Sequence, residues 1–132
     1  MMQQLRHVNI DAAASPPQVP FSHAVADGHY AFLAGQLAAD AIDREVTSAN
    51  IEEETRVAME LLGKVLRRLG LDFGDVVRVN VYMTDLREID RMNAVYSTYF
   101  DPERPPARTC VGVAQLIGGS RVEIDCIARL RP

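Results

Sequence analysis

Four side chains that could do chemistry lie close together near the C-terminus. Arg108 and Cys110 belong to one run of strand-forming residues, and Glu123 and Asp125 belong to the next. The planar fork of an arginine can hold a carboxylate through two parallel hydrogen bonds. A carboxylate whose pKa is raised in an enclosed site can position or deprotonate a water molecule. The set is therefore compatible with a site that binds a small carboxylic acid and adds water to it.

The alternation of side chains predicts how these residues are arranged. We expect Arg104 to Ala128 to form an antiparallel β-hairpin with a glycine turn, in which opposed residues point to the same face. The register that buries most apolar surface places one set on the side covered by helices: Thr109, Val111, Val113, Val122, Ile124 and Cys126. Arg108, Cys110, Glu123 and Asp125 then share the opposite face.

This cluster has two open interpretations. It is either a structural network of ion pairs at a subunit interface, or a site in which Arg108 binds a carboxylate and Glu123 handles water. Cys110 is a candidate nucleophile, but the sequence places no histidine to activate it, and a thiol in a strand commonly serves in packing. We therefore expect Cys110 to line the site.

The elements that position the cluster follow from local patterns. Asp27-Gly28 predicts a hairpin turn between strands at about residues 22–26 and 30–37, with a further strand near residues 5–10. Asn50 followed by Glu53 predicts the start of a helix whose apolar period runs to Gly70. The acids at 52–54 are interpreted as a solvated first turn favoured by the helix dipole.

A strand with two unlike faces follows, with Val77, Val79 and Val81 on one side. A second helix is expected from Thr84 or Asp85 to the Asp101-Pro102 stop. Two helices can cover only one face of a sheet of five or six strands. The other face must be wet or meet another subunit, and its valines favour a symmetric oligomer.

Composition limits the classes of protein that are compatible with this sequence. The 132 residues are 48% apolar, which suits a single domain spanning residues 1–132. The net charge is −4 and Lys and Arg form no cluster, which disfavours nucleic-acid binding. We expect no membrane span, no secretory signal and a cytoplasmic protein. The two cysteines and three histidines match no zinc spacing, so no metal site is expected.

From about Pro20 to Arg129 the chain resembles the RidA/YjgF/UK114 family of reactive-intermediate (enamine/imine) deaminases, long labelled endoribonuclease L-PSP. The runs that carry the resemblance are AGQLA at 34–38, GDVVRVNVYMTDL at 74–86, MNAVYSTYF at 92–100, RPPARTCVGVAQL at 104–116 and VEIDCIA at 122–128. The Pro-Ala-Arg-Thr-Cys-Val strand followed by Val-Glu-Ile-Asp is the specific part of this signal.

The resemblance implies an α+β, chorismate-mutase-like fold and a homotrimer with active sites in clefts between neighbouring subunits. It implies that Arg108 binds the substrate carboxylate, Cys110 lines the pocket, Glu123 handles the hydrolytic water and Asn93 lies near the site. The implied reaction is the hydrolysis of 2-aminoacrylate and related enamine or imine acids to 2-oxo acids and ammonia, without a cofactor. Asp125 has no assigned role and is kept as structural.

Two departures from the family pattern concern substrate binding. The chain has Val19-Pro20-Phe21 where many members have Gly-Pro-Tyr, and Ala34-Gly35-Gln36 where the deaminase pattern has Ser-Gly-Gln. We expect Phe21, Ala34 and Gly35 to line the substrate site. Because two hydroxyl groups are lost there, the substrate is expected to be different or more apolar.

Other functions stay open at this point. One is a specialised catabolic deaminase of the 2-aminomuconate type, and another is a non-catalytic trimer that binds small carboxylates or acts as a holdase. Ribonuclease activity is disfavoured because the chain is acidic and offers no histidine pair or metal constellation for phosphodiester cleavage.

Overall fold

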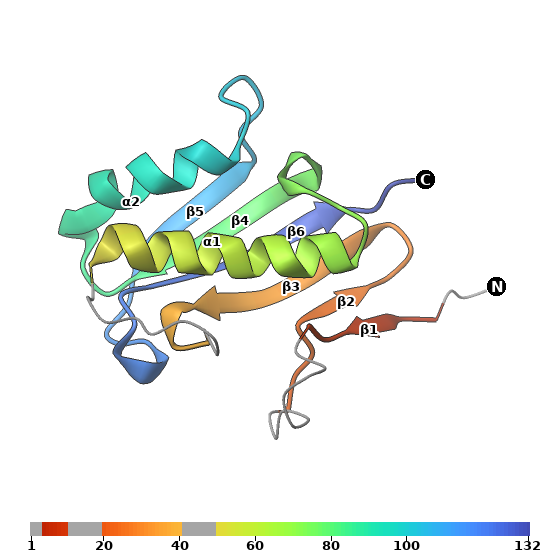
Figure 1. Ribbon diagram of the computed structural model, residues 1–132, viewed down its shortest axis with the longest axis horizontal. Coiled ribbons are helices and arrows are strands. Elements are labelled where there is room, and N and C mark those ends of the chain that lie inside the picture. Colours follow the sequence, from red (N-terminus) through yellow and green to blue (C-terminus); the bar gives the residue numbers. More distant parts are fainter. Residues whose placement is uncertain (1–3, 11–19, 41–49) are drawn as a thin grey trace.

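Six strands form one mixed sheet in the order β1-β2-β3-β6-β4-β5 (Figure 1). The computed structural model describes residues 4–10, 20–40 and 50–132. The proline-rich run from Ala13 to Pro20 predicts a loop, and all of it but Pro20 lies outside the described residues. The strands are β1 (Arg6–Val8), β2 (Ala24–Ala26), β3 (Tyr30–Leu37), β4 (Val76–Met83), β5 (Ala107–Gly112) and β6 (Val122–Arg129).

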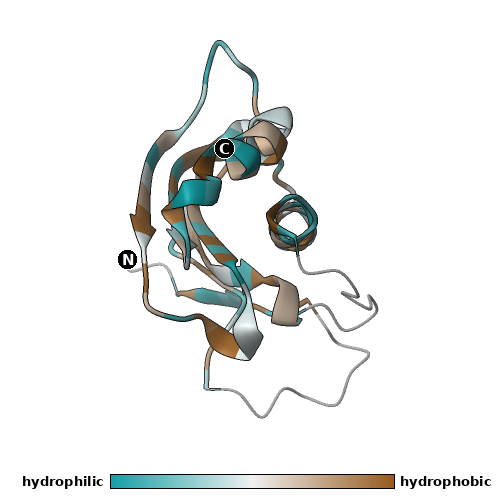
Figure 2. Ribbon diagram, turned by 90° about the vertical axis from the view of Figure 1, so that its left-hand side faces the viewer, coloured by the Kyte–Doolittle hydropathy of each residue, from teal (hydrophilic) through white to brown (hydrophobic). Residues whose placement is uncertain are grey.

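Two α-helices lie on one face of the sheet (Figure 1). They are α1 (Ile51–Arg68) and α2 (Ile89–Tyr96), and short 3₁₀ turns at Leu86–Glu88 and Ser97–Tyr99 flank α2. Figure 2 shows α1 end-on beside the sheet, whose other face carries no helix among the described residues. The predicted mixed sheet of five to six strands with two helices on one face is therefore confirmed.

The first helix begins where the sequence predicts. The side chain of Asn50 accepts a hydrogen bond from the backbone N–H of Glu53 at 2.8 Å, which satisfies one of the unpaired donors of the first turn. The apolar period of α1 then packs on the sheet and forms the core with residues of β4 and β6. The largest side chains in this core include Ile51, Met59, Leu62, Leu66, Val79, Val81, Met83 and Ile124.

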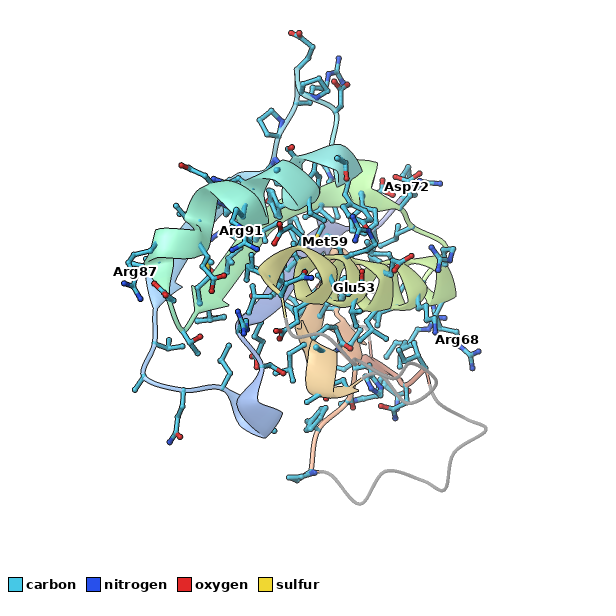
Figure 3. The ribbon with its side chains drawn as sticks, turned by 60° about the vertical axis from the view of Figure 1, so that its left-hand side comes forward. Glu53, Met59, Arg68, Asp72, Arg87 and Arg91 are labelled. Carbon is cyan, nitrogen blue, oxygen red and sulfur yellow. The ribbon has the colours of Figure 1, made fainter. Side chains whose placement is uncertain are left out.

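Charged side chains of the helices divide between solvent and structural roles. Arg68 extends outward from the last turn of α1 (Figure 3). Arg91 of α2 forms an ion pair with Glu52 of α1 at 2.7 Å. The interpretation of all three first-turn acids as solvated is wrong for Glu54, whose side chain is 2% exposed. It bonds to the segment that leads into β6.

The first hairpin also agrees with the prediction. Strands β2 and β3 pair antiparallel, and Gly28 in the turn has a φ of 100°, a conformation that glycine adopts at little cost. One carboxylate oxygen of Asp27 accepts the N–H groups of His29 and Tyr30 at 2.9 and 2.8 Å. This turn fixes the start of β3, which later contributes to the candidate site.

The predicted hairpin between residues 104 and 128 is wrong. Strand β4 lies between β5 and β6; it pairs parallel with β5 and antiparallel with β6. The physical reason is the order strand, helix, strand: α2 carries the chain from β4 back to a parallel neighbour, as crossover connections do. Strand β5 thereby takes the edge of the sheet and β6 joins from the other side.

The prediction that four polar residues share one face is wrong for the same reason. Arg108 and Cys110 oppose Val79 and Val81 on the covered face, whereas Glu123 and Asp125 oppose Tyr82 and Asn80 on the uncovered face. Val77 was also expected on the same face of the strand as Val79, and it does not lie there. It is 41% exposed because the register of β4 against β6 shifts between Val76 and Arg78.

Within the part of the chain that the structure describes, neither helix is long and apolar enough to cross a membrane.

Candidate functional site

Arg108 is held above helix α2 at the edge of the sheet. Its Nη1 donates a hydrogen bond to Oδ1 of Asn93 at 2.6 Å, and its Cζ lies 4.8 Å from the centroid of the Tyr96 ring. That distance is within the range of an attractive cation–π contact. Strand β5 supplies the arginine, and α2 supplies both groups that hold it.

Cys110 lies two residues further along β5 on the same face. Its side chain is half-buried and packs against the core. Burial raises the pKa of the Cys110 thiol, and the nearby charge of Arg108 only partly opposes this. A thiol with a raised pKa is a weak nucleophile at neutral pH. We call Arg108, Asn93, Tyr96 and Cys110 the Arg108 half-site.

The charge of Arg108 has no anionic partner among the described residues. Ion pairs within 4.0 Å are found for Arg56, Arg87, Arg91, Arg121 and Arg131. Arg108 instead bonds to a neutral amide, which orients the guanidinium without neutralising it. Such an arrangement leaves the cation available to an incoming carboxylate.

Glu123 lies near the start of β6 on the uncovered face, against the backbone of β3. The register of β3 and β6 shifts between Leu33 and Gln36, and this irregularity brings Gly35 next to the Glu123 carboxylate. A Cβ added at Gly35 would collide with Oε2 of Glu123. Glycine at this position therefore permits the close approach of the carboxylate to the strand.

The surroundings of Glu123 favour its protonated form. Burial is the main cause of its raised pKa, and the negative charges of Asp40 and Asp125 raise it further. Asp125 itself accepts a hydrogen bond from Nδ2 of Asn80 at 2.9 Å, which supports its structural assignment. A carboxyl group whose pKa moves toward neutrality can both accept and donate a proton.

Phe21 and Ala34 lie on the segments next to Gly35. The N–H of Ala34 donates to the carbonyl of His23 at 2.8 Å, and the Phe21 ring contacts the His23 ring edge-to-face at 6.1 Å. Phe21 is 53% exposed, so it does not fill a pocket within this chain. We call Glu123, Gly35, Ala34 and Phe21 the Glu123 half-site.

The two half-sites do not meet within one chain. They lie on opposite faces of the sheet, and β4 separates their strands, which places β5 and β6 about 10 Å apart. A small carboxylate on Arg108 therefore does not reach Glu123 of the same chain. Tyr96 was missed by sequence reasoning, although its spacing of three residues from Asn93 places both on one side of α2.

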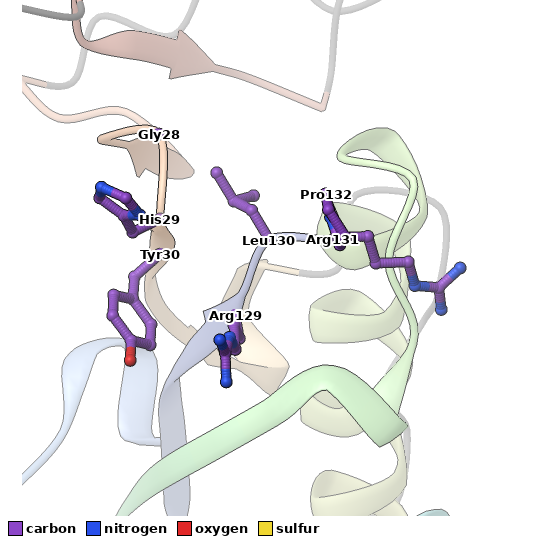
Figure 4. A pocket seen from close by; sticks show the side chains of 7 residues that line it. All are labelled: Gly28, His29, Tyr30, Arg129, Leu130, Arg131 and Pro132. Carbon is purple, nitrogen blue, oxygen red and sulfur yellow. The ribbon is translucent and has the colours of Figure 1, made fainter.

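A separate cavity of about 270 Å³ lies beside the C-terminal end of β6 (Figure 4). It is formed by the β2–β3 turn at Gly28 to Tyr30 and by the C-terminal residues Arg129 to Pro132. No residue of either half-site lines it. Within residues 4–10, 20–40 and 50–132, no group of three or more His, Cys, Asp or Glu side chains could hold a metal ion.

The fold and the two half-sites define a small α+β protein in which an arginine oriented by a neutral amide and a carboxyl group with a raised pKa lie on opposite faces of one sheet. Residues 12–130 match the family model described as Endoribonuclease L-PSP. The chain belongs to this family, which is also known as the RidA/YjgF family.

Individual relatives and solved structures agree with this assignment. A mouse relative named 2-iminobutanoate/2-iminopropanoate deaminase is 36% identical over 109 residues, which cover 83% of this chain and 80% of the relative. A putative endoribonuclease from Thermotoga maritima is 38% identical with a TM-score of 0.84, covering 96% of this chain and 98% of that chain. E. coli TdcF with bound serine is 29% identical with a TM-score of 0.79, covering 94% and 98%.

Proposed function

We propose that this protein hydrolyses small enamine or imine carboxylic acids, of the 2-aminoacrylate type, to 2-oxo acids and ammonia. The observation that carries the proposal is the orientation of Arg108 by Asn93 without an anionic partner among the described residues. A cation held in this way suits a substrate carboxylate. The name of the mouse relative supports the reaction, and the serine bound to TdcF supports a ligand of this size.

We infer that the site is completed between copies of the chain, in a homotrimer. Arg108 and Glu123 lie on opposite faces of one sheet, so the Arg108 half-site of one copy needs the Glu123 half-site of the next. Exposed apolar side chains on the uncovered face support such an assembly: Phe32 is 45%, Val111 40% and Tyr30 38% exposed. Cytoplasmic location and independence of a cofactor stay predictions from the sequence.

The proposed reaction assigns one task to each half-site. Arg108 binds the substrate carboxylate, and the enamine takes up a proton from solvent at carbon and becomes an iminium ion. A water molecule held by Glu123 adds its oxygen to the iminium carbon and gives up one proton to Glu123, which leaves a carbinolamine. Glu123 passes this proton to the nitrogen. The carbon–nitrogen bond then breaks as the hydroxyl group returns a proton to solvent, so that ammonia and a 2-oxo acid are the products. The raised pKa of Glu123 supports this exchange of a proton.

The first test is a coupled assay in which a threonine dehydratase or an amino-acid oxidase generates the enamine or imine in situ. Wild type should accelerate loss of the intermediate. Arg108→Ala should lose activity chiefly through a higher KM, whereas Glu123→Gln should keep binding and lose turnover. Equal and small effects of the two variants would contradict the assigned roles. Saturable binding of 2-oxo acids without turnover would instead indicate that the protein binds carboxylates and is not an enzyme.

Mixing the two impaired variants, at a substrate concentration well below the KM of Arg108→Ala, tests where the site is formed. In rings assembled at random from equal amounts of Arg108→Ala and Glu123→Gln chains, about a quarter of the sites combine an intact arginine with an intact glutamate from the next copy. Co-expression should therefore recover about a quarter of wild-type activity per chain. A site built within one chain would recover none, and each variant expressed alone provides the baseline.

A further inference from the structure

Tyr96 is a tyrosine that the proposed reaction does not yet use. It is the last residue of α2, and its side chain is 7% exposed. Its ring carries the guanidinium of Arg108 on one face, with Cζ at 4.8 Å from the ring centroid. Burial of a ring below an arginine strengthens a cation–π contact, because water does not compete for the charge.

The second contact to Arg108 comes from the same helix. Asn93 precedes Tyr96 by three residues, so the two side chains lie on one side of α2. Asn93 bonds to one end of the guanidinium at 2.6 Å, while the Tyr96 ring supports its plane. Asn93 takes up one N–H group at one end of the guanidinium, which leaves other N–H groups for a carboxylate.

The Tyr96 ring is itself held in place by an aromatic cluster. It packs on Phe100 with 5.0 Å between ring centroids, and Phe100 packs on Phe73 at 5.6 Å. Phe73 in turn contacts Tyr99 at 5.3 Å. A ring fixed on its other sides loses little further freedom when Arg108 stacks on it. The orientation of Arg108 is then set before a ligand arrives, which lowers the entropic cost of binding.

We propose that Tyr96 is a positioning residue, whose buried ring presets the guanidinium of Arg108 for two-pronged binding of a substrate carboxylate. This inference rests on the proposed function for the identity of the substrate. We call the Tyr96 ring beneath the guanidinium of Arg108 the seat. The seat should affect the binding of any small carboxylate, whether or not the protein turns it over. The part of Tyr96 that matters is the ring, because the contact to Arg108 is made over the ring face.

Three variants distinguish the effect of the ring contact to Arg108 from a general disturbance of core packing. Tyr96→Leu removes the ring and keeps an apolar side chain, Tyr96→Phe keeps the ring, and Phe100→Leu disturbs the same cluster without touching Arg108. We expect Tyr96→Leu to raise the Kd for 2-oxobutanoate, the product formed from the threonine-derived imine, by about three- to thirtyfold. Tyr96→Phe should restore most of that affinity, and Phe100→Leu should shift Kd less than Tyr96→Leu.

The kinetic readout is a split between KM and kcat. Tyr96→Leu should raise KM in the coupled assay by about the same factor as Kd and change kcat much less, since Arg108 holds the carboxylate in ground and transition states alike. Equal effects of Tyr96→Leu and Phe100→Leu on KM would overturn the proposal. So would a loss in Tyr96→Phe as large as in Tyr96→Leu.

A measurement without ligand keeps the proposal testable if the variants fold poorly or if the wild type shows no turnover. In protein labelled with ¹⁵N-arginine, the Nε–H signal assigned through Arg108→Lys should show the upfield shift caused by a ring beneath it. An unshifted signal in the wild type would overturn the seat. A shifted signal and Tyr96-dependent binding of 2-oxobutanoate without hydrolysis would keep the seat and reject the proposed reaction.

Discussion

Glu54 joins helix α1 to the segment that leads into β6, and its removal should be costly. Its Oε1 accepts the backbone N–H of Arg121 at 2.8 Å. Its Oε2 makes no hydrogen bond among the described residues but lies 3.4 Å from Nε of Arg121. The N–H of Thr84 bonds to the carbonyl of Arg121 at 3.1 Å. The backbone N–H and the carbonyl of Arg121 are thus both hydrogen-bonded, two residues before Glu123.

Glu54→Ala removes a charged acceptor from a buried donor. Loss of a hydrogen bond to a charged group costs about 1.5–3 kcal/mol of unfolding free energy. The ion pair adds little, because the Arg121 side chain is 38% exposed and water screens its charge. The expected loss is therefore about 1.5–2 kcal/mol, the lower end of that range, since removing the carboxylate also removes the cost of burying its charge.

Glu53→Ala is the matched control, one position earlier in the same helical turn. The Glu53 side chain is 39% exposed and pairs with Arg56 at 3.0 Å across one turn, an interaction worth about 0.5 kcal/mol. Both variants remove one acid from the helix N-terminus. Urea unfolding at pH 7, followed by circular dichroism at one protomer concentration, gives the difference. Equal losses in the two variants would refute a structural role for the buried carboxylate.

Three further outcomes follow from the half-sites. Burial raises the pKa of Cys126 to about 12, so Ellman's reagent at pH 8 should modify Cys110 first and Cys126 only after unfolding; peptide mapping that finds Cys126 labelled as fast would contradict its burial. The raised pKa of Glu123 means that the folded state binds more protons between the unfolded and folded pKa values, so stability falls as pH rises through this window. Glu123→Gln should accordingly raise the midpoint of thermal unfolding at pH 7, and this gain should disappear below about pH 4; a gain independent of pH would exclude the titration of Glu123 as its cause. Gly35→Ala places a methyl group against the Glu123 carboxylate. It should lower kcat by about ten- to a hundredfold, while the far-ultraviolet circular dichroism spectrum stays unchanged. Normal turnover would show that the Glu123 side chain moves aside without loss of activity.

Local signals in the sequence were sufficient to predict the elements whose ends are fixed by a side-chain hydrogen bond or by a glycine. Asn50 caps α1 with its own side chain, and Asp27-Gly28 closes the first hairpin through a carboxylate and a positive φ. Each signal depends only on residues a few positions apart, so a single sequence contains it. Residue types and alternation indicated Arg108 and Glu123, and the resemblance added Asn93. The structure shows that Arg108 lies with Asn93 and on the opposite face of the sheet from Glu123.

Strand pairing is where the prediction from alternation went wrong. Alternation assigns residues to two sides of a strand, but the neighbouring strand decides which side is covered. The order of β4, α2 and β5 was the available signal, because a helix between two strands favours their parallel pairing. Reading it would have placed β5 beside β4 and turned Arg108 toward α2, where Asn93 and Tyr96 hold it.

Tyr96 shows why part of the site was concealed in the apolar pattern. In the sequence it continues the period of Ile89, Met92 and Val95, which predicts a core residue, and its burial confirms that. A period identifies which side chains are inside but not what lies over them. Because β5 is the edge strand, its covered side turns a charged residue toward the end of α2. The aromatic ring that completes the core there is therefore also the surface on which Arg108 rests.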